Sequence, residues 1–340
     1  MTFHHKPVRV GLIGAGRMGS FHAENLAYRV PGAVLAAVAD PLPGAAEALT
    51  NKLGVAAKAY SDLHALLQDA EIDAVAIAAP ARTHAEWVIA AANAGKHVFC
   101  EKPMAVTLAD ADRAIAAAKA AGVVLQVGFN RRFDSGFAAA IAAVKAGENG
   151  TTQLSRSLTR DPGLHDPSRI PQWTIFLETL IHDFDTLLHF NPGAKPVEIY
   201  ALADALVRPD FKDQGLLDTS VVTIRFDNGA IATAEANFQA VYGYDVRGEV
   251  FGSKGMLLAG HINANHCVRY HQDGIAIETS RMDSDLLREA YVAEMAEFAR
   301  CIRSGETPRA TGEDARNALE IAVACIESVQ QQKPIKLGAR

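Results

Sequence analysis

The stretch VRVGLIGAGRMGSFHAENL, residues 8–26, decides the first half of the fold. Its apolar start, VRVGLI, predicts a buried strand, and the glycines that follow have the spacing GxGxxG before a helical pattern begins. In this spacing Gly14 allows a tight turn, Gly16 lets a ligand approach the backbone closely, and Gly19 lets the helix pack against the strand. The helix N-terminus adds N–H donors and a positive dipole end. The pattern therefore predicts a turn that binds the pyrophosphate of a dinucleotide.

Asp40 ends the second predicted strand and lies 21 residues after Gly19. A carboxylate at this position accepts both hydroxyls of the adenine ribose and repels a 2′-phosphate. Pro41 and Leu42, which follow, supply no cation for such a phosphate. NAD is therefore favoured over NADP. The alternative is that Asp40 only caps the helix that begins near Gly44, because aspartate is also a good N-cap residue.

The alternation of apolar strand and helix continues to about residue 129. Further apolar runs lie at 73–80, 97–103 and 123–129, and long helical patterns separate them. Continuous apolar strands joined by helices predict a parallel sheet that is covered on both faces, which is a doubly wound α/β architecture. We therefore expect a nucleotide-binding domain at residues 1–128.

After this point the pattern changes, and it predicts a second α/β domain at residues 129–340. From residue 196 on, β-branched and polar residues alternate between turn signals, such as the Asp-Asn-Gly turn in VVTIRFDNGAIATAEANF, and predict an antiparallel sheet. Helical patterns at 286–304 and 313–331 finish the chain. A length of 340 residues exceeds the usual size of one core, which agrees with two domains.

Composition limits the partners that the chain can have. The net charge of −6 comes without blocks of like charge, which argues against a nucleic-acid-binding surface, and no basic amphipathic segment indicates membrane binding. No apolar run reaches the roughly 18 residues that span a bilayer, and the first residues do not resemble a secretory signal, so we expect a cytoplasmic protein with a small-molecule partner. The cysteines form no CxxC pair, and no His, Cys and carboxylate group has zinc-site spacing, so we expect buried thiols and no metal. The cysteines are Cys100, Cys267, Cys301 and Cys325.

The stretch FLETLIHDFDTL, residues 176–187, carries acids and a histidine beside an apolar stripe. If the segment is one α-helix, with about 100° per residue, then Glu178, His182 and Asp185 share a narrow face next to the buried stripe. Asp183 falls on a third face. The plain alternative is a solvent-facing Glu–His interaction worth roughly 0.2–0.5 kcal/mol.

Lys102 follows directly after a predicted strand, in the sequence CEKP at residues 100–103. In open parallel sheets ligands bind beyond the carboxyl ends of the strands, so this lysine should point toward the reactive end of the cofactor. Pro103 restricts the local backbone. The alternative is an ordinary surface lysine.

These stretches belong to a longer, ordered set of motifs. The set comprises GLIGAGRMG, Asp40, APARTHAE at 79–86, EKP at 101–103, GFNRRFD at 128–134, ETLIHDFD, and YGYDVRGEVFGSKG at 242–255. It resembles the glucose–fructose oxidoreductase/inositol dehydrogenase family, most closely its inositol 2-dehydrogenase branch, over nearly the whole chain. The resemblance implies an N-terminal Rossmann domain, a C-terminal α/β domain on a large, mostly antiparallel open sheet, and NAD-dependent oxidation of a ring hydroxyl. It also favours a homo-oligomer, with a tetramer as the expected state.

The resemblance also implies roles for individual residues. Lys102 would be catalytic, together with Glu178 and His182 as an acid–histidine pair. Inositol dehydrogenases usually have aspartate as the acid of that pair, so Glu178 is a departure that bears on the substrate more than on the chemistry. The expected cofactor-binding residues are Gly14, Gly16, Arg17, Met18, Gly19, Asp40, Ala79, Pro80, His84, Glu101 and Lys102. The expected substrate-binding residues are Asn130, Arg131, Asp185 and Tyr242. Arg131 and Arg132 have the alternative of pairing with Asp134.

Oxidation of a secondary alcohol gives these residues distinct tasks. A hydride moves from carbon to NAD and a proton moves from the hydroxyl to a base, for which His182 is the natural candidate. Glu178 would hold the imidazole in one tautomer and stabilise its charged form, and Lys102 would donate a hydrogen bond to the oxygen as charge grows on it. We therefore expect an NAD-dependent dehydrogenase of a cyclic polyol similar to myo- or scyllo-inositol.

Other functions are open at this level. A dehydrogenase of the same family could oxidise an aldopyranose sugar, or a relative could use NAD transiently during an elimination or hydrolysis. From another class comes a non-catalytic NAD-binding redox sensor. Such a sensor has no use for Lys102, Glu178 and His182, so their presence argues against it.

Overall fold

The computed structural model describes residues 6–164 and 166–338 and divides into two compact units. The first unit contains the chain up to Asn130 together with Glu289–Arg316. The second contains Arg131–Arg288 together with the chain from Asn317 onward. The segment Glu289–Arg316 thus belongs with the N-terminal residues, although the sequence pattern assigned all of 129–340 to one domain.

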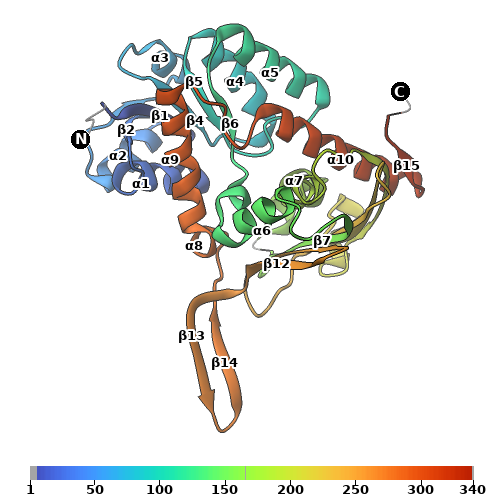
Figure 1. The fold of residues 1–340 in the computed structure, drawn as a ribbon. Coiled ribbons are helices and arrows are strands. Elements are labelled where there is room, and N and C mark those ends of the chain that lie inside the picture. Colours follow the sequence, from blue (N-terminus) through green and yellow to red (C-terminus); the bar gives the residue numbers. More distant parts are fainter. Residues whose placement is uncertain (1–5, 165, 339–340) are drawn as a thin grey trace. The chain divides into compact units, whose positions relative to one another are not determined.

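The first unit is built on a sheet with the strand order β3-β2-β1-β4-β5-β6, and every neighbouring pair in it is parallel (Figure 1). The strand order reverses between β1 and β4, and the carboxyl ends at such a reversal are where this architecture binds its ligand. The strands are β1 (Val8–Ile13), β2 (Ala33–Ala39), β3 (Lys58–Tyr60), β4 (Ala74–Ile77), β5 (His97–Cys100) and β6 (Leu125–Val127). The helices are α1 (Arg17–Tyr28), α2 (Ala45–Leu53), α3 (Leu63–Gln68), α4 (His84–Asn93), α5 (Leu108–Ala121) and α9 (Arg288–Ser304). The predicted doubly wound parallel sheet is confirmed.

The core of this unit lies between the sheet and its helices. The strand side chains Val10, Leu12 and Phe99 are fully buried, as expected for strands covered on both faces. Met295 and Phe298 of α9 lie in the same hydrophobic cluster. A helix from near the end of the chain therefore completes the core of the N-terminal unit.

The second unit is built on a mixed sheet with the strand order β12-β11-β7-β10-β9-β8-β15. Its neighbouring strands pair antiparallel, except for β7 and β10, which pair in parallel. The strands are β7 (Thr152–Arg160), β8 (Pro196–Asp204), β9 (Thr219–Phe226), β10 (Ile231–Asn237), β11 (Asp245–Gly252), β12 (Gly255–His261) and β15 (Ile335–Lys336). The helices are α6 (Ser135–Lys145), α7 (Ile181–Phe190), α8 (Asp283–Leu286) and α10 (Gly312–Gln331), the last of which begins in the first unit. The predicted large, mostly antiparallel sheet is confirmed.

The two faces of this sheet have different surroundings. Helices α6 and α7 pack on the inner face, where Phe137 and Phe190 lie against Gly248 of β11. Strand register places the side chains of Leu154, Ile231 and Phe251 together on the other, outer face. The exposed apolar residues of the outer face are Leu154, Leu202, Val221, Ile231, Phe251, Met256 and Leu258. A patch of this kind is typical of a surface that contacts another protein.

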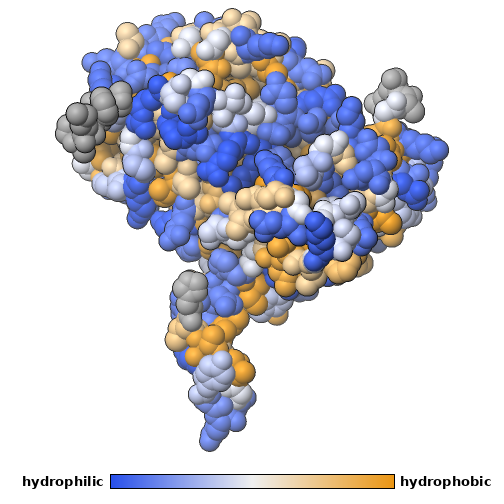
Figure 2. Space-filling view, in the orientation of Figure 1, coloured by the Kyte–Doolittle hydropathy of each residue, from blue (hydrophilic) through white to orange (hydrophobic). Residues whose placement is uncertain are grey.

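A two-stranded ribbon of β13 (Asn263–His271) and β14 (Gly274–Thr279) projects from the second unit (Figure 1). Figure 2 shows hydrophobic side chains along it, and Tyr270 and Ile275 are more than half exposed. Cys267 on β13 is exposed, so the expectation of a buried thiol is wrong there, whereas the other three cysteines are buried. Within the described ranges, no helix is long and apolar enough to cross a membrane.

Candidate cofactor and active site

The glycine turn between β1 and α1 is shaped by two close backbone contacts. Gly14 has a φ of +99°, and a Cβ atom on it would lie 2.7 Å from the carbonyl oxygen of Ala78. A Cβ atom on Gly19 would lie 1.8 Å from the carbonyl oxygen of Gly14. Gly16, the N-cap residue of α1, has open space at that position instead, and Arg17 beside it is exposed. The turn is thus closed toward the protein and open at the helix N-terminus, which fits a pyrophosphate.

Asp40 links the end of β2 to this turn. Its carboxylate accepts hydrogen bonds from the backbone N–H of Ala15, at 2.7 Å, and of Leu42, at 2.9 Å. The N-cap residue of α2 is Gly44, so the alternative that Asp40 caps this helix is wrong. Each carboxylate oxygen keeps a second lone pair, which can accept a ribose hydroxyl. Asp40 therefore fits the adenosine side of NAD while it holds the glycine turn in place.

His84 holds the loop after β4 to the loop after β5. Its ring is buried, and its two nitrogens lie 2.7 Å from the carbonyl oxygen of Ala79 and 2.8 Å from that of Pro103. The sequence motif suggested that His84 binds the cofactor, but the structure gives both ring nitrogens protein partners. Its evident task is to position the two loops. Ala79 is half-buried and Pro80 is exposed at the carboxyl end of β4.

Glu101 and Lys102 follow β5 at the same edge of the sheet. Glu101 is buried, and its Oε1 lies 2.6 Å from Nε2 of His22, while its Oε2 accepts a hydrogen bond from the backbone N–H of Lys102 at 3.1 Å. Burial alone would raise the pKa of Glu101, but the hydrogen bond and charge of His22, together with the charges of Lys102 and His84, lower that pKa. Lys102 is half-buried, and its peptide bond to Pro103 is cis. Glu101 thus supports the backbone from which Lys102 extends.

In the second unit, Glu178 and His182 do not lie on one regular α-helix. Glu178 belongs to a π-helical turn, Ile175–Thr179, and His182 to the first turn of α7, which begins at Ile181. The assumption of about 100° per residue therefore fails before Ile181, because a π turn contains more residues than an α turn. Both side chains are half-buried. Single π turns in helices often occur at functional sites.

Asp183 is fully buried rather than on a free face of the helix. Its carboxylate forms an ion pair with Arg131 at 2.7 Å and accepts hydrogen bonds from Ser157 at 2.5 Å and Thr159 at 2.6 Å. Arg131 also donates to Thr159. The guanidinium of Arg131, expected to bind substrate, is therefore held inside the unit between α7 and β7.

A second buried ion pair lies beside the first. Arg132 donates to Asp185, with 2.8 Å between Nε and Oδ2, so the carboxylate that was expected to bind substrate is engaged by an arginine. The alternative that these arginines pair with Asp134 is wrong, because Asp134 caps α6 by accepting from the backbone N–H groups of Gly136 and Phe137. Asn130 is buried at the end of the first unit. Its Oδ1 has no hydrogen-bond partner among the described residues.

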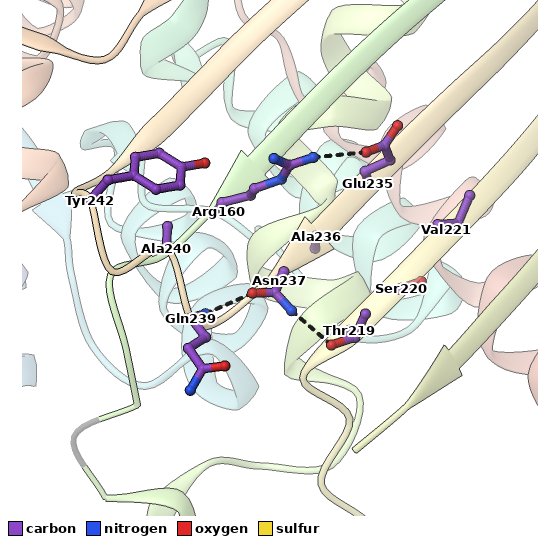
Figure 3. Close-up of a pocket in the computed structure, with 10 residues that line it drawn as sticks. All are labelled: Arg160, Thr219, Ser220, Val221, Glu235, Ala236, Asn237, Gln239, Ala240 and Tyr242. Carbon is purple, nitrogen blue, oxygen red and sulfur yellow. Dashed lines mark hydrogen bonds and ion pairs between the residues drawn. The ribbon is translucent and has the colours of Figure 1, made fainter. Parts of the chain in front are cut away.

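Tyr242 lies on the outer side of the second sheet. Its hydroxyl donates to Asp245 at 2.6 Å, and it borders a pocket of about 340 Å³ beside the ion pair of Arg160 and Glu235 (Figure 3). Strand register puts Arg160 and Glu235 on the face opposite to Thr159, which contacts Asp183 of α7. The sheet therefore separates Tyr242 from His182, and the alternating pattern alone gave no way to choose the face.

Two residues near Lys102 were missed by the sequence analysis. His22 on α1 contacts Glu101, and Glu294 on α9 lies close to both. The three residues are far apart in the sequence, so no motif spacing connects them. The only available signal was a histidine and a glutamate on helical faces that are otherwise apolar.

The glycine turn, Asp40 and the strand order define the class of this protein as a dinucleotide-binding α/β protein. Residues 8–129 match the model of an oxidoreductase family with an NAD-binding Rossmann fold, and residues 168–337 match the C-terminal alpha/beta domain of the same family. The chain therefore belongs to this family, known as Gfo/Idh/MocA, and it is an NAD-dependent oxidoreductase.

Similar proteins align over almost the whole chain. The chain is 40% identical to myo-inositol 2-dehydrogenase of Thermotoga maritima, over 97% of this chain and 98% of that protein. It is 36% identical to scyllo-inositol 2-dehydrogenase (NAD(+)) of Bacillus subtilis, over 98% and 97% of the two chains. The solved structure of scyllo-inositol dehydrogenase from Lactobacillus casei with bound NAD(H) and scyllo-inositol superposes with a TM-score of 0.92. That structure is 28% identical and covers 98% of this chain and 100% of its own.

The position of Asp40 leads to a prediction about cofactor choice. NAD should be used much more efficiently than NADP, and Asp40→Ser should reduce the ratio of the two kcat/KM values by about tenfold or more, because the repulsion of a 2′-phosphate is lost. The measurement is initial-rate kinetics with both cofactors. Asp62→Ser, which changes the N-cap of α3, is a control that should leave the ratio unchanged. Equal kcat/KM values for the two cofactors in the unmodified protein would contradict the assignment.

The buried pair of Asp183 and Arg131 leads to a prediction about stability. Asp183→Asn should lower the free energy of unfolding by about 3–5 kcal/mol, because it leaves the guanidinium buried without its counter-charge. Urea denaturation measures the change. Asp204→Asn, at the exposed ion pair with Lys212, is the matched control and should cost less than about 1 kcal/mol. A similar decrease in the free energy of unfolding for the two variants would show that the buried ion pair contributes no more to stability than the exposed one.

Proposed function

We propose that this protein oxidises a secondary ring hydroxyl of a cyclic polyol of the inositol class to a ketone. The observation that carries the proposal is the similarity over nearly the full length to proteins named as myo- and scyllo-inositol 2-dehydrogenases. It is supported by the half-buried Glu178, which lies in a π turn, and by His182 in the first turn of the helix that follows. NAD, when bound, accepts the hydride from the substrate carbon. The residues of the chain then have to bind the ring, remove the hydroxyl proton and stabilise the oxygen.

In this proposal His182 takes the hydroxyl proton. An imidazole is suited to this task because it changes charge near neutral pH. Glu178, just before α7, orients the ring and stabilises its protonated form, as carboxylates do for other histidine bases. Lys102 donates a hydrogen bond to the substrate oxygen while negative charge develops there. The buried arginine pairs behind α7 hold the helix that carries His182.

The role of Lys102 can be tested directly. Lys102→Ala should lower kcat by about 10²–10³-fold, because one hydrogen-bond donor to the developing charge is lost, while NAD still binds. The rate of NADH formation, followed by absorbance, gives kcat. Titration of the protein fluorescence with NAD gives the dissociation constant of NAD. Lys96→Ala is the control in the same unit, because the ammonium group of Lys96 donates to the carbonyl oxygens of Asp69 and Ile72 and has only a structural role. A Lys102→Ala enzyme with near-normal kcat would show that the lysine is structural.

The role of Glu178 leads to another prediction. Glu178→Gln should lower kcat strongly and alter its pH profile, because an amide cannot stabilise a charged imidazole as a carboxylate does. Glu178→Asp keeps the charge but withdraws it by one methylene, and displacements near 1 Å can matter about a hundredfold. It should retain activity and change the ranking of inositols against aldopyranoses. Glu198→Gln, a glutamate on β8, is the control. An unchanged pH profile in Glu178→Gln would contradict the pairing with His182.

The substrate itself is tested by a screen of inositols and aldopyranoses for NADH formation. Highest kcat/KM with an inositol supports the proposal, and highest kcat/KM with an aldopyranose would make the protein a sugar dehydrogenase. Glu178 in place of the usual aspartate is the observation that favours the second outcome. Absence of NADH formation across the whole panel would point to a redox sensor.

We also propose that the protein is a homo-oligomer, with a tetramer as the expected state. The exposed apolar face of the second sheet supports this, because Ile231, Phe251 and Leu258 would otherwise remain in water. Light scattering gives the mass of the particle. Leu258→Glu should shift it toward a smaller species.

A further inference from the structure

A buried cluster of ionisable groups lies inside the first unit, under the strand end that carries Lys102. His22 comes from α1, Glu101 follows β5, and Glu294 comes from α9, and one ligand atom of each lies within 4.8 Å of the others. The exposed fractions of these residues are 0%, 5% and 0%. The rings of Phe99 and Tyr291 stand 5.5 and 5.8 Å from the imidazole of His22. The cluster is therefore enclosed by apolar walls that strengthen every electrostatic interaction within it.

The hydrogen bonds in this cluster are unevenly distributed. Glu101 has partners on both oxygens, His22 on one and the backbone N–H of Lys102 on the other. Neither carboxyl oxygen of Glu294 has a hydrogen-bond partner in the part of the chain that the structure describes. Its backbone carbonyl accepts from Gln126 at 2.7 Å, so the helix turn itself is fixed. A buried carboxyl group without a partner is costly as an anion and much less costly as a neutral acid.

The distance between His22 and Glu101 fits a hydrogen bond between the two side chains better than a metal ion bound by both. Two ligands of one tetrahedral metal, each about 2.0–2.1 Å from it, stand roughly 3.3 Å apart. Nε2 of His22 and Oε1 of Glu101 are only 2.6 Å apart, which is a charge-assisted hydrogen bond. Among the described residues this is the one group of histidine, cysteine and carboxylate side chains close enough to consider for a metal.

We propose that Glu294 is a positioning residue for the reaction: as a neutral carboxylic acid it donates a hydrogen bond to Glu101, directly or through one buried water, and so fixes the backbone that presents Lys102. The distance within the cluster is one that a bridging water or a small side-chain rotation closes. Glu101 has little freedom to respond in another way. A Cβ atom on Gly128 would lie 3.3 Å from its carboxyl carbon, so the backbone of Gly128 already packs against it. The inference rests on the role proposed for Lys102.

The charges that face Glu294 support this assignment. Burial, and next the negative charge of Glu101, raise the pKa of the Glu294 carboxyl well above its usual range. Within the cluster, His22 lowers the pKa of Glu101, and Lys102 after β5 and His84 from α4 also lower it. The thiol of Cys100 and the ring of Tyr291 lie beside the cluster as well. Glu101, which contacts His22, is therefore the carboxylate of the pair, and Glu294 is the neutral acid.

An infrared measurement tests the proton without any substrate. The difference spectrum between the unmodified protein and Glu294→Gln, at neutral pH, should contain the carbonyl stretch of a protonated carboxylic acid. Glu297→Gln is the matched control on the same helix, because Glu297 accepts from the backbone and the guanidinium of Arg309 and should contribute no such band. Absence of the acid band in the first difference spectrum, or a stoichiometric divalent metal in the purified protein that Glu294→Gln loses, would overturn the proposal.

A comparison of two variants tests the positioning role. The amide of Glu294→Gln can still donate to Glu101, so this variant should keep most of the kcat. Glu294→Leu has no donor and should lower kcat by about tenfold to a hundredfold with little change in KM, because Lys102 is no longer held in register. It should do so while staying folded, since leucine suits an apolar site. Equal kcat values in the two variants, whether both high or both low, would contradict the role.

The pH dependence of stability gives a further readout that is independent of activity. Because the pKa of Glu294 is higher in the folded than in the unfolded state, its contribution is complete below the unfolded value of about 4.3 and is lost as pH rises toward the folded value. The Tm of the unmodified protein relative to Glu294→Gln should thus be highest at acid pH and fall toward neutral and alkaline pH. A difference that does not change with pH would count against a neutral acid. The two proposals can be told apart. If the infrared and Tm measurements show a protonated Glu294 but Lys102→Ala has near-normal kcat, the proposed role of Lys102 is wrong, whereas the assignment of Glu294 as a neutral acid is still supported.

Discussion

The close contact between Gly19 and the carbonyl oxygen of Gly14 is the constraint on which the first unit depends. The space between them leaves no room for a side chain, so α1 starts directly on the turn that ends β1. That single approach fixes several things at once. It aims the helix N-terminus at open space beside Gly16, brings the N–H of Ala15 to Asp40, and sets His22 one and a half turns along α1 opposite Glu101. The turn expected to bind the cofactor and the position of His22 beside Glu101 therefore both depend on the close approach of Gly19 to Gly14.

The second unit solves a different problem, which is how to hold α7 against a sheet while His182 in its first turn stays half-buried. It does so with charges: Arg131 and Arg132 are buried and each is paired with an aspartate of α7. The hydroxyls of Ser157 and Thr159 satisfy the remaining acceptor sites of Asp183. Buried ion pairs of this kind add less to stability than apolar packing would, but they accept only one register of helix on strand. Such a register is useful where a base has to be held in place.

Sequence reasoning succeeded where burial on both faces leaves a continuous apolar signal. The parallel strands and the glycine turn could be predicted because strands such as β1 and β4 have few other interpretations. The placement of α9 could not, since helical periodicity shows that one face is apolar but not which core receives it. The wheel through Glu178 failed because a π turn breaks the period that the wheel assumes. The face on which Tyr242 lies and the grouping of His22, Glu101 and Glu294 depend on proximity in space, which a single sequence does not contain.

The return of α9 to the first unit has a consequence for how the protein is made. The N-terminal strands and helices leave the ribosome early, but Met295 and Phe298, which close their hydrophobic core, are synthesised only after the whole of the second sheet except β15. During synthesis at about 5–20 residues per second, the early segment therefore waits many seconds with part of its apolar surface uncovered. A fragment that ends at Asn130 would thus be an incomplete domain rather than a smaller one.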